Sequence, residues 1–176
     1  MEVNILAHVV NMKKWILMFL MMAMAHSAFS QVLLDQKRNG RRLVSTHAAV
    51  LTDEGKSPLV YIGYSVQIEG GSHAYYLTVG IKSNQPISKV NAGDRLLLKI
   101  GNHDVLKYTA QANSKFSQSG QTYYSNSSYR INKSDIDRIA RAQRLRIAMS
   151  DGVLDVDVAR NAYRNTLRQA NEILKF

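Results

Sequence analysis

The chain has 176 residues, a formal net charge of +10 and no cysteine. Its length suits one domain with short additions. The missing cysteine excludes a disulfide framework, a thiolate metal site, a cysteine nucleophile and a lipid anchor built on cysteine, and the positive charge favours solubility and negatively charged partners.

The first thirty residues have the pattern of a secretory signal peptide. Lys13 and Lys14 precede an apolar run from Trp15 to Ala25, and small residues at positions 28 and 30 follow that run. A positively charged start, an apolar middle and a small-x-small exit are typical of a segment that is removed on secretion. We therefore predict a signal peptide over residues 1–30.

Cleavage is expected after Ser30, which would leave residues 31–176 as a single mature domain, and Met12 is the expected start of translation. The alternatives are an uncleaved anchor or a buried helix, but the apolar run is shorter than the roughly 20 residues that a membrane span needs. Removal of residues 1–30 takes away two lysines and one glutamate, so the mature domain carries about +9. The expected location is secreted or periplasmic, without an integral membrane span after cleavage.

Strand patterns dominate the first half of the mature domain. Residues 31–42 indicate an arm or an early strand, and residues 43–52 are rich in β-branched and small residues. Residues 59–69 and 73–83 alternate between apolar and polar side chains, and Gly70-Gly71-Ser72 separates them. Period-two alternation on both sides of a glycine turn predicts a β-hairpin.

The tetrapeptide Gly101-Asn102-His103-Asp104 resembles a block of the calcineurin-like metallophosphoesterases, in which it lies beside two metal ions. The other blocks of that family are missing, since Asp53 begins no Asp-x-His and no histidine follows His103. A two-metal site needs many more ligands than these residues supply. We therefore predict a turn between strands at residues 94–100 and 105–110, with His103 exposed at the tip.

Helical patterns come late in the chain. Ser134 indicates the N-cap of a short helix over residues 134–142, and Asp157 or Asp155 indicates the cap of an amphipathic helix over residues 158–174. Strands at residues 145–149 and 153–156 lie between them, joined by an Asp151-Gly152 turn.

Together these patterns predict an α+β fold. We expect a mainly antiparallel sheet of about seven or eight strands, drawn from residues 43–110 and 129–156, with the C-terminal helix packed on it.

A row of arginines is one candidate binding surface. Arg160, Arg164 and Arg168 recur every four residues on the polar face of the C-terminal helix. Arginine binds phosphate and carboxylate groups in a bidentate manner, so this face indicates an anion-binding surface. The alternative is an ordinary solvated helix face whose charges pair with neighbouring acids. Four more arginines precede the row: Arg138, Arg141, Arg144 and Arg146.

A polar stretch with embedded tyrosines is the second candidate. Residues 111–128 are rich in Ser, Gln and Asn and predict a long loop. Tyr123, Tyr124, Asn126 and Tyr129 combine flat rings with hydrogen-bonding groups, which suits a glycan or a peptide partner. The alternative is a hairpin tip whose tyrosines pack back on the sheet.

Catalytic motifs are scarce. The mature chain has His47, His73 and His103 on separate segments, and it has no Gly-x-Ser-x-Gly elbow or phosphate-binding glycine loop. Asp151, Asp155 and Asp157 are readily explained as turn, strand and cap residues. We expect no cofactor or metal, and a hydrolase built from scattered His and Asp residues is the alternative to a protein without catalytic activity.

With a signal sequence ending at Ser30, Gln31 at the mature terminus and no cysteine, the chain resembles the small exported proteins of Bacteroidetes-type bacteria. This resemblance implies secretion or a periplasmic location and no particular activity. The leading hypothesis is an exported, non-catalytic binding or structural module. The alternatives are the hydrolase and a binder of anionic surfaces through Arg160, Arg164 and Arg168.

Overall fold

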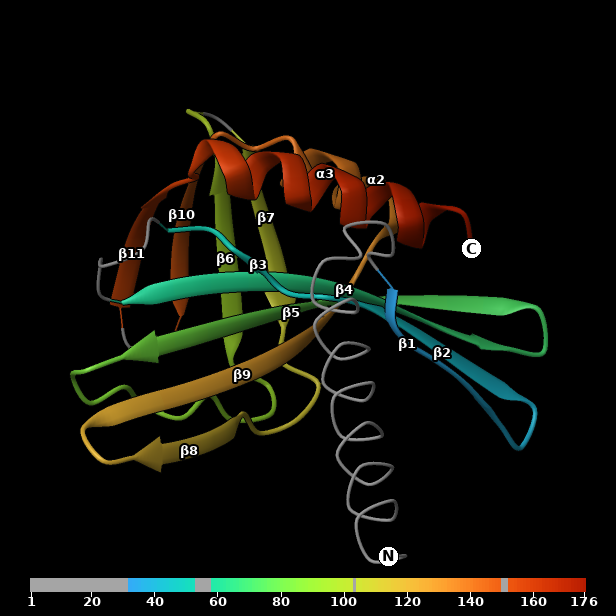
Figure 1. Cartoon of the computed structure of the whole chain (residues 1–176), viewed down its shortest axis with the longest axis horizontal. Helices are drawn as coiled ribbons and strands as arrows, with labels where there is room; N and C mark the ends of the chain where they lie inside the picture. Colours follow the sequence, from blue (N-terminus) through green and yellow to red (C-terminus); the bar gives the residue numbers. More distant parts are fainter. Residues whose placement is uncertain (1–31, 53–57, 103, 150–151) are drawn as a thin grey trace, which may run out of the picture. The chain divides into compact units, whose positions relative to one another are not determined.

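The computed structural model describes residues 32–176 apart from 53–57, 103 and 150–151, and the signal-peptide prediction lies outside these residues. The described residues form an α+β fold with mostly antiparallel strands (Figure 1), which confirms the predicted class. The expected count of seven or eight strands is too low, because the described part of the chain contains eleven. The strands are β1 (Val32–Arg38), β2 (Arg41–Thr46), β3 (Ala49–Val50), β4 (Leu59–Glu69), β5 (Ser72–Ser83), β6 (Arg95–Ile100), β7 (Asp104–Thr109), β8 (Lys115–Ser119), β9 (Thr122–Ile131), β10 (Arg144–Met149) and β11 (Gly152–Asp157).

The strands form two sheets instead of the single sheet expected. Sheet A has the order β1-β2-β4-β5-β9-β8, with β3 beside β4, and sheet B has the order β11-β10-β6-β7. Figure 1 shows the strands of sheet B crossing those of sheet A at a steep angle. The two sheets meet where the end of β7 reaches β9, through a bridge between Ala110 and Tyr129. The core lies between the sheets.

The β4–β5 hairpin is confirmed in its register and in its faces. Glu69 pairs with Ser72, so Gly70 and Gly71 form the turn, and both have positive φ angles of 55° and 81°. Glycine adopts such angles without the steric cost that a Cβ atom imposes. The alternating apolar residues of both strands lie in the core: Val60, Ile62, Tyr64, Val66, Tyr75, Leu77, Val79 and Ile81.

Two other hairpins bear on the predictions. The described part of the predicted arm, residues 32–42, belongs to the β1–β2 hairpin, whose turn is Asn39-Gly40 with φ angles of 50° and 76°. Strands β6 and β7 pair around Gly101 and Asn102, which confirms the turn predicted for the metallophosphoesterase-like tetrapeptide. The predicted exposure of His103 falls outside the described residues.

Two helices follow β9, namely α2 (Lys133–Ala140) and α3 (Arg160–Leu174). Neither has the predicted cap: α2 begins after Asn132 and α3 after Ala159, without a side-chain cap hydrogen bond in either case. Asp155 and Asp157 belong to β11, where they pair with arginines of β10. Within the described residues, no helix is both long and apolar enough to cross a membrane.

Helix α3 covers the core, as predicted. Its buried face includes Ala162, Ala170 and Ile173, and the Thr166 hydroxyl donates to the Ala140 carbonyl at the end of α2 over 3.0 Å. Figure 1 shows α2 and α3 side by side. The Ala159 N–H donates to the Leu51 carbonyl over 2.9 Å, which ties the start of α3 to the chain next to β3.

Tyr64 is buried on β4, and its hydroxyl has no hydrogen-bond partner among the described residues. Burial raises the pKa of this hydroxyl above the ordinary value of about 10. The folded chain therefore keeps a proton that the unfolded chain releases as the pH rises above 10. Above about pH 10 the contribution of Tyr64 to the free energy of unfolding consequently falls, by up to about 1.4 kcal/mol per pH unit.

Replacing Tyr64 by phenylalanine is expected to remove this contribution. The loss of unfolding free energy between about pH 8 and about pH 11 should be smaller for Tyr64→Phe than for the natural chain. Stability near neutral pH should not fall, because the lost hydroxyl had no partner. Urea denaturation at the two pH values measures both effects, and an equal loss in the two proteins would contradict the expectation.

Candidate ligand-binding cavity

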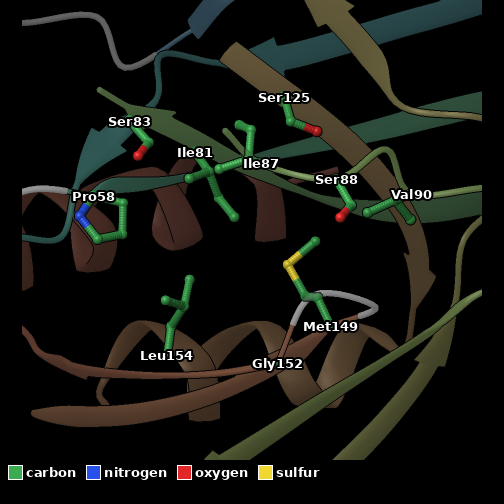
Figure 2. A pocket seen from close by; sticks show the side chains of 10 residues that line it. All are labelled: Pro58, Ile81, Ser83, Ile87, Ser88, Val90, Ser125, Met149, Gly152 and Leu154. Carbon is green, nitrogen blue, oxygen red and sulfur yellow. The ribbon is translucent and has the colours of Figure 1, made fainter. Parts of the chain in front are cut away.

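A cavity of about 110 Å³ lies between the two sheets at one end of β5. Figure 2 shows Met149 and Leu154 pointing across it toward Ile81. Most of the described side chains that line it are apolar, and none of these is acidic, basic or a histidine. The cavity therefore offers a neutral, largely apolar surface. The lining residues are Pro58, Ile81, Ser83, Ile87, Ser88, Val90, Ser125, Met149, Gly152 and Leu154.

Ser125 on β9 gives this apolar cavity a polar group. The residue is only 3% exposed, and within the described part of the chain its hydroxyl has no hydrogen-bond partner. A buried polar group without a partner costs about 1–3 kcal/mol, and such groups are uncommon in native proteins. The hydroxyl of Ser125 is therefore a candidate for contact with a bound molecule.

Ser83 shows how a lining serine can be satisfied by the fold itself. Its Oγ accepts a hydrogen bond from the backbone N–H of Gln85 over 3.0 Å, just beyond the end of β5. This bond holds the chain as it leaves the strand. Ser125 lies in the middle of β9, where the backbone groups pair with neighbouring strands, and it forms no comparable bond.

The alternation of β9 explains why a serine faces the core. Ser125, Ser127, Tyr129 and Ile131 occur at every second position, and all four are buried. Ser125 lies opposite Ile81 of β5, and Ser127 lies opposite Val79. The inner face of β9 thus places three hydroxyl groups, those of Ser125, Ser127 and Tyr129, among side chains that are otherwise apolar.

The predicted ligand loop is a hairpin instead of a loop, formed by β8 and β9. Its candidate residues do not form one surface, because neighbouring residues of a strand point to opposite faces. Tyr129 is fully buried, and burial raises the pKa of its hydroxyl. Tyr123 packs near Phe116, with ring centroids 6.4 Å apart. Tyr124 and Asn126 are half-buried on the outer face.

On that outer face, Asn126 has a structural contact. The Tyr61 hydroxyl donates to Asn126 Oδ1 over 2.6 Å. The Tyr61 ring lies over Gly80 of β5, the strand between β4 and β9. A bulkier residue than glycine at position 80 would overlap the ring. Tyr124 lies near the ammonium group of Lys82, 5.8 Å from ring centroid to nitrogen. These contacts are part of the packing within the sheet. A ligand role for Tyr123, Tyr124, Asn126 and Tyr129 stays a prediction.

The row formed by Arg160, Arg164 and Arg168 is exposed along α3. In the described part of the molecule, none of the three forms an ion pair. The four preceding arginines differ, because each has a carboxylate partner. The pairs are Arg138–Asp135, Arg141–Asp137, Arg144–Asp157 and Arg146–Asp155, with distances of 2.9, 2.8, 3.3 and 2.6 Å.

The residues considered for a hydrolase are dispersed. His47, between β2 and β3, and His73, on β5, are both exposed, and His103 and Asp151 lie outside the described residues. Arg146 lowers the pKa of Asp155 by a hydrogen bond to its carboxylate. No group of three or more potential metal ligands occurs among the residues that the structure describes.

The buried carboxylate of Asp135 is held by its neighbours. The Tyr108 hydroxyl donates to Asp135 Oδ2 over 2.7 Å, and Arg138 Nη1 donates to Oδ1 over 2.9 Å. Burial, followed by this hydrogen bond, raises the pKa of Tyr108. Both carboxylate oxygens thus have partners, and the hydrogen bond between Tyr108 and Asp135 connects β7 to α2.

Sequence reasoning missed the cavity and attributed the serines of residues 111–128 to a polar loop. The alternation of Ser125, Ser127, Tyr129 and Ile131 is the signal that places them on one strand face. That signal is weak, because serine commonly marks the exposed positions of a strand. No protein-family model matches the chain, and neither a curated protein nor a solved structure shows significant similarity to it.

Proposed function

We propose that this protein is a non-catalytic binding module that holds a small neutral ligand in the cavity between its two sheets. The observation that carries the proposal is an apolar cavity containing the buried, unpartnered hydroxyl of Ser125. Small-molecule sites are typically apolar hollows with a few polar groups that orient the ligand. Among the described residues, the lining has no group suited to acid-base catalysis near neutral pH, since none of them is a carboxylate, a histidine or a lysine.

Toluene is a suitable first probe, because it is small, neutral and apolar, like most of the side chains that line the cavity. In a protein with labelled methyl groups, toluene should shift the NMR signals of Ile81, Met149 and Leu154. The signal of Ile173, a residue of α3 that is buried in the core outside the cavity lining, should stay in place. The proposal fails if no cavity methyl responds up to the solubility limit of toluene.

A matched pair of variants tests whether toluene binds inside the cavity. Leu154→Trp should fill the cavity and abolish the toluene shifts, because the larger ring occupies the same space. Leu97→Trp makes the same change at a half-buried position of β6 outside the lining. Toluene should bind this control as it binds the natural chain. Equal responses of the two variants would argue against binding in the cavity.

We also propose that the module acts outside the cytoplasm, as its predicted signal peptide suggests. Expression in a bacterium with a secretion pathway should yield a periplasmic or secreted chain. Mass spectrometry of its N-terminal peptide should identify Gln31 as the first residue. A chain that stays in the cytoplasm and begins at Met1 or Met12 would contradict the export proposal, without affecting ligand binding.

A second candidate function is binding of an anionic surface through Arg160, Arg164 and Arg168. The absence of acidic partners for these three among the described residues supports it, because the four neighbouring arginines are all paired. Surface charges of this kind attract anions over about 10 Å at 0.1 M salt and less at higher salt. Retention on immobilised heparin should therefore fall steeply as salt rises.

The test compares two triple variants with the same loss of charge. Replacing Arg160, Arg164 and Arg168 by glutamine should shorten retention markedly. The control variant replaces three exposed lysines by glutamine, namely Lys37 on β1, Lys107 on β7 and Lys115 on β8. Its retention on heparin should change little. Equal losses in both variants would show a general charge effect and would count against the arginine row.

A further inference from the structure

The position of Ser125 in the cavity restricts the chemistry of the ligand. A purely apolar molecule would cover the hydroxyl without giving it a hydrogen bond, and an unpaired buried donor is unfavourable. A molecule with a suitably placed oxygen would pair with it. Ser125 lies opposite Ile81 in the sheet register. A ligand oxygen bound to the Ser125 hydroxyl would therefore lie next to the apolar side chain of Ile81.

The described lining residues offer no partner for a full charge on the buried part of the ligand. None of the ten lining residues carries an ionisable side chain. An ionised carboxylate or ammonium group would lose its hydration there without gaining an opposite charge, which is strongly unfavourable. The buried part of the ligand is therefore neutral.

The size of the cavity limits this buried part. A volume of about 110 Å³ suits a single ring or a short alkyl segment. Ile81, Met149 and Leu154 surround that space with branched and flexible apolar groups (Figure 2). Contact with these three side chains accounts for the apolar part of the ligand, and Ser125 accounts for its polar part.

From this geometry we infer that the ligand is a neutral amphiphile of the phenol or alcohol type, whose oxygen hydrogen-bonds to Ser125 while its ring or alkyl group packs against Ile81, Met149 and Leu154. The inference rests on the proposed function, because it specifies the ligand of the same cavity.

Phenol and toluene test the inference, since they have similar shapes and differ by a hydroxyl in place of a methyl group. Their dissociation constants can be measured from the methyl NMR shifts of the natural chain and of Ser125→Ala. The substitution should weaken phenol binding about three- to tenfold, as expected for the loss of one hydrogen bond. Toluene binding should be unchanged or tighter. Benzoate, which carries a charge, should bind at least tenfold more weakly than phenol.

Ser128→Ala is the matched control, because Ser128 lies on the same strand but belongs to its opposite, outer face. Its affinities for phenol and toluene should equal those of the natural chain. Ser125→Ala should also melt at the same temperature or higher, because it removes an unpaired buried hydroxyl.

The outcomes separate the two proposals. If neither phenol nor toluene binds the natural chain, the proposed function fails. If both bind and Ser125→Ala changes their affinities equally, the binding module stands and the inference about the ligand oxygen is overturned. If benzoate binds as tightly as phenol, the inference that the buried part of the ligand is neutral is overturned.

Discussion

A chain that ends at Asp157 is expected to lose cooperative unfolding. Helix α3 covers the core with Ala162, Ala170 and Ile173, and Ile173 is fully buried. Truncating one buried isoleucine to alanine typically costs about 2–5 kcal/mol, and a whole domain is stable by only about 5–15 kcal/mol. Deletion of residues 158–176 should therefore leave a chain with a broad thermal transition and poorly dispersed NMR signals.

The single substitution Ile173→Ala is the graded control for this deletion. It should remain folded and melt cooperatively at a lower temperature, because the rest of α3 still covers the core. The role of α3 as the cover of the core would be refuted by a deleted chain that melts as sharply, and at the same temperature, as the natural chain.

Alanine at position 80 is expected to destabilise the fold by about 1–3 kcal/mol, a typical cost of overpacking. A Cβ atom there would overlap the ring of Tyr61 and would come within 2.6 Å of Asn126 Oδ1. The ring would have to move, which would strain or break its hydrogen bond to Asn126. Chemical denaturation of Gly80→Ala measures the effect.

Gly63 provides the matched control on β4. A Cβ atom at that position would meet its nearest neighbours at 3.7 Å, which is ordinary van der Waals contact. Gly63→Ala should be neutral or stabilising by up to about 1 kcal/mol, because glycine is unfavourable within a strand. In a Tyr61→Ala background the cost of Gly80→Ala should disappear. A cost that persists there would contradict the proposed overlap.

Local patterns were sufficient to predict the elements whose side chains alternate regularly. The β4–β5 hairpin follows from two alternating strands around Gly70 and Gly71, and α3 follows from apolar residues spaced by three and four. The Asn39-Gly40 turn was also visible, since this dipeptide favours the backbone angles of a tight hairpin. It was missed because the polar residues around it lack a strong apolar alternation.

Other features depend on contacts between distant segments. The division into two sheets is set by the pairing of β6 with β10, which are separated by more than forty residues. Asp155 and Asp157 have the residue type of a helix cap, but pairing of β11 with β10 places them opposite Arg146 and Arg144. The cavity likewise combines Ile81, Ser125 and Leu154, which no local pattern relates.

The order of the elements along the chain has a consequence for synthesis. The Leu51 carbonyl emerges from the ribosome long before the Ala159 N–H that it binds, and Ile173 of α3 follows every strand of both sheets. Domains generally fold as units during or after synthesis. A nascent chain of this protein therefore keeps its apolar strand faces uncovered until α3 is made.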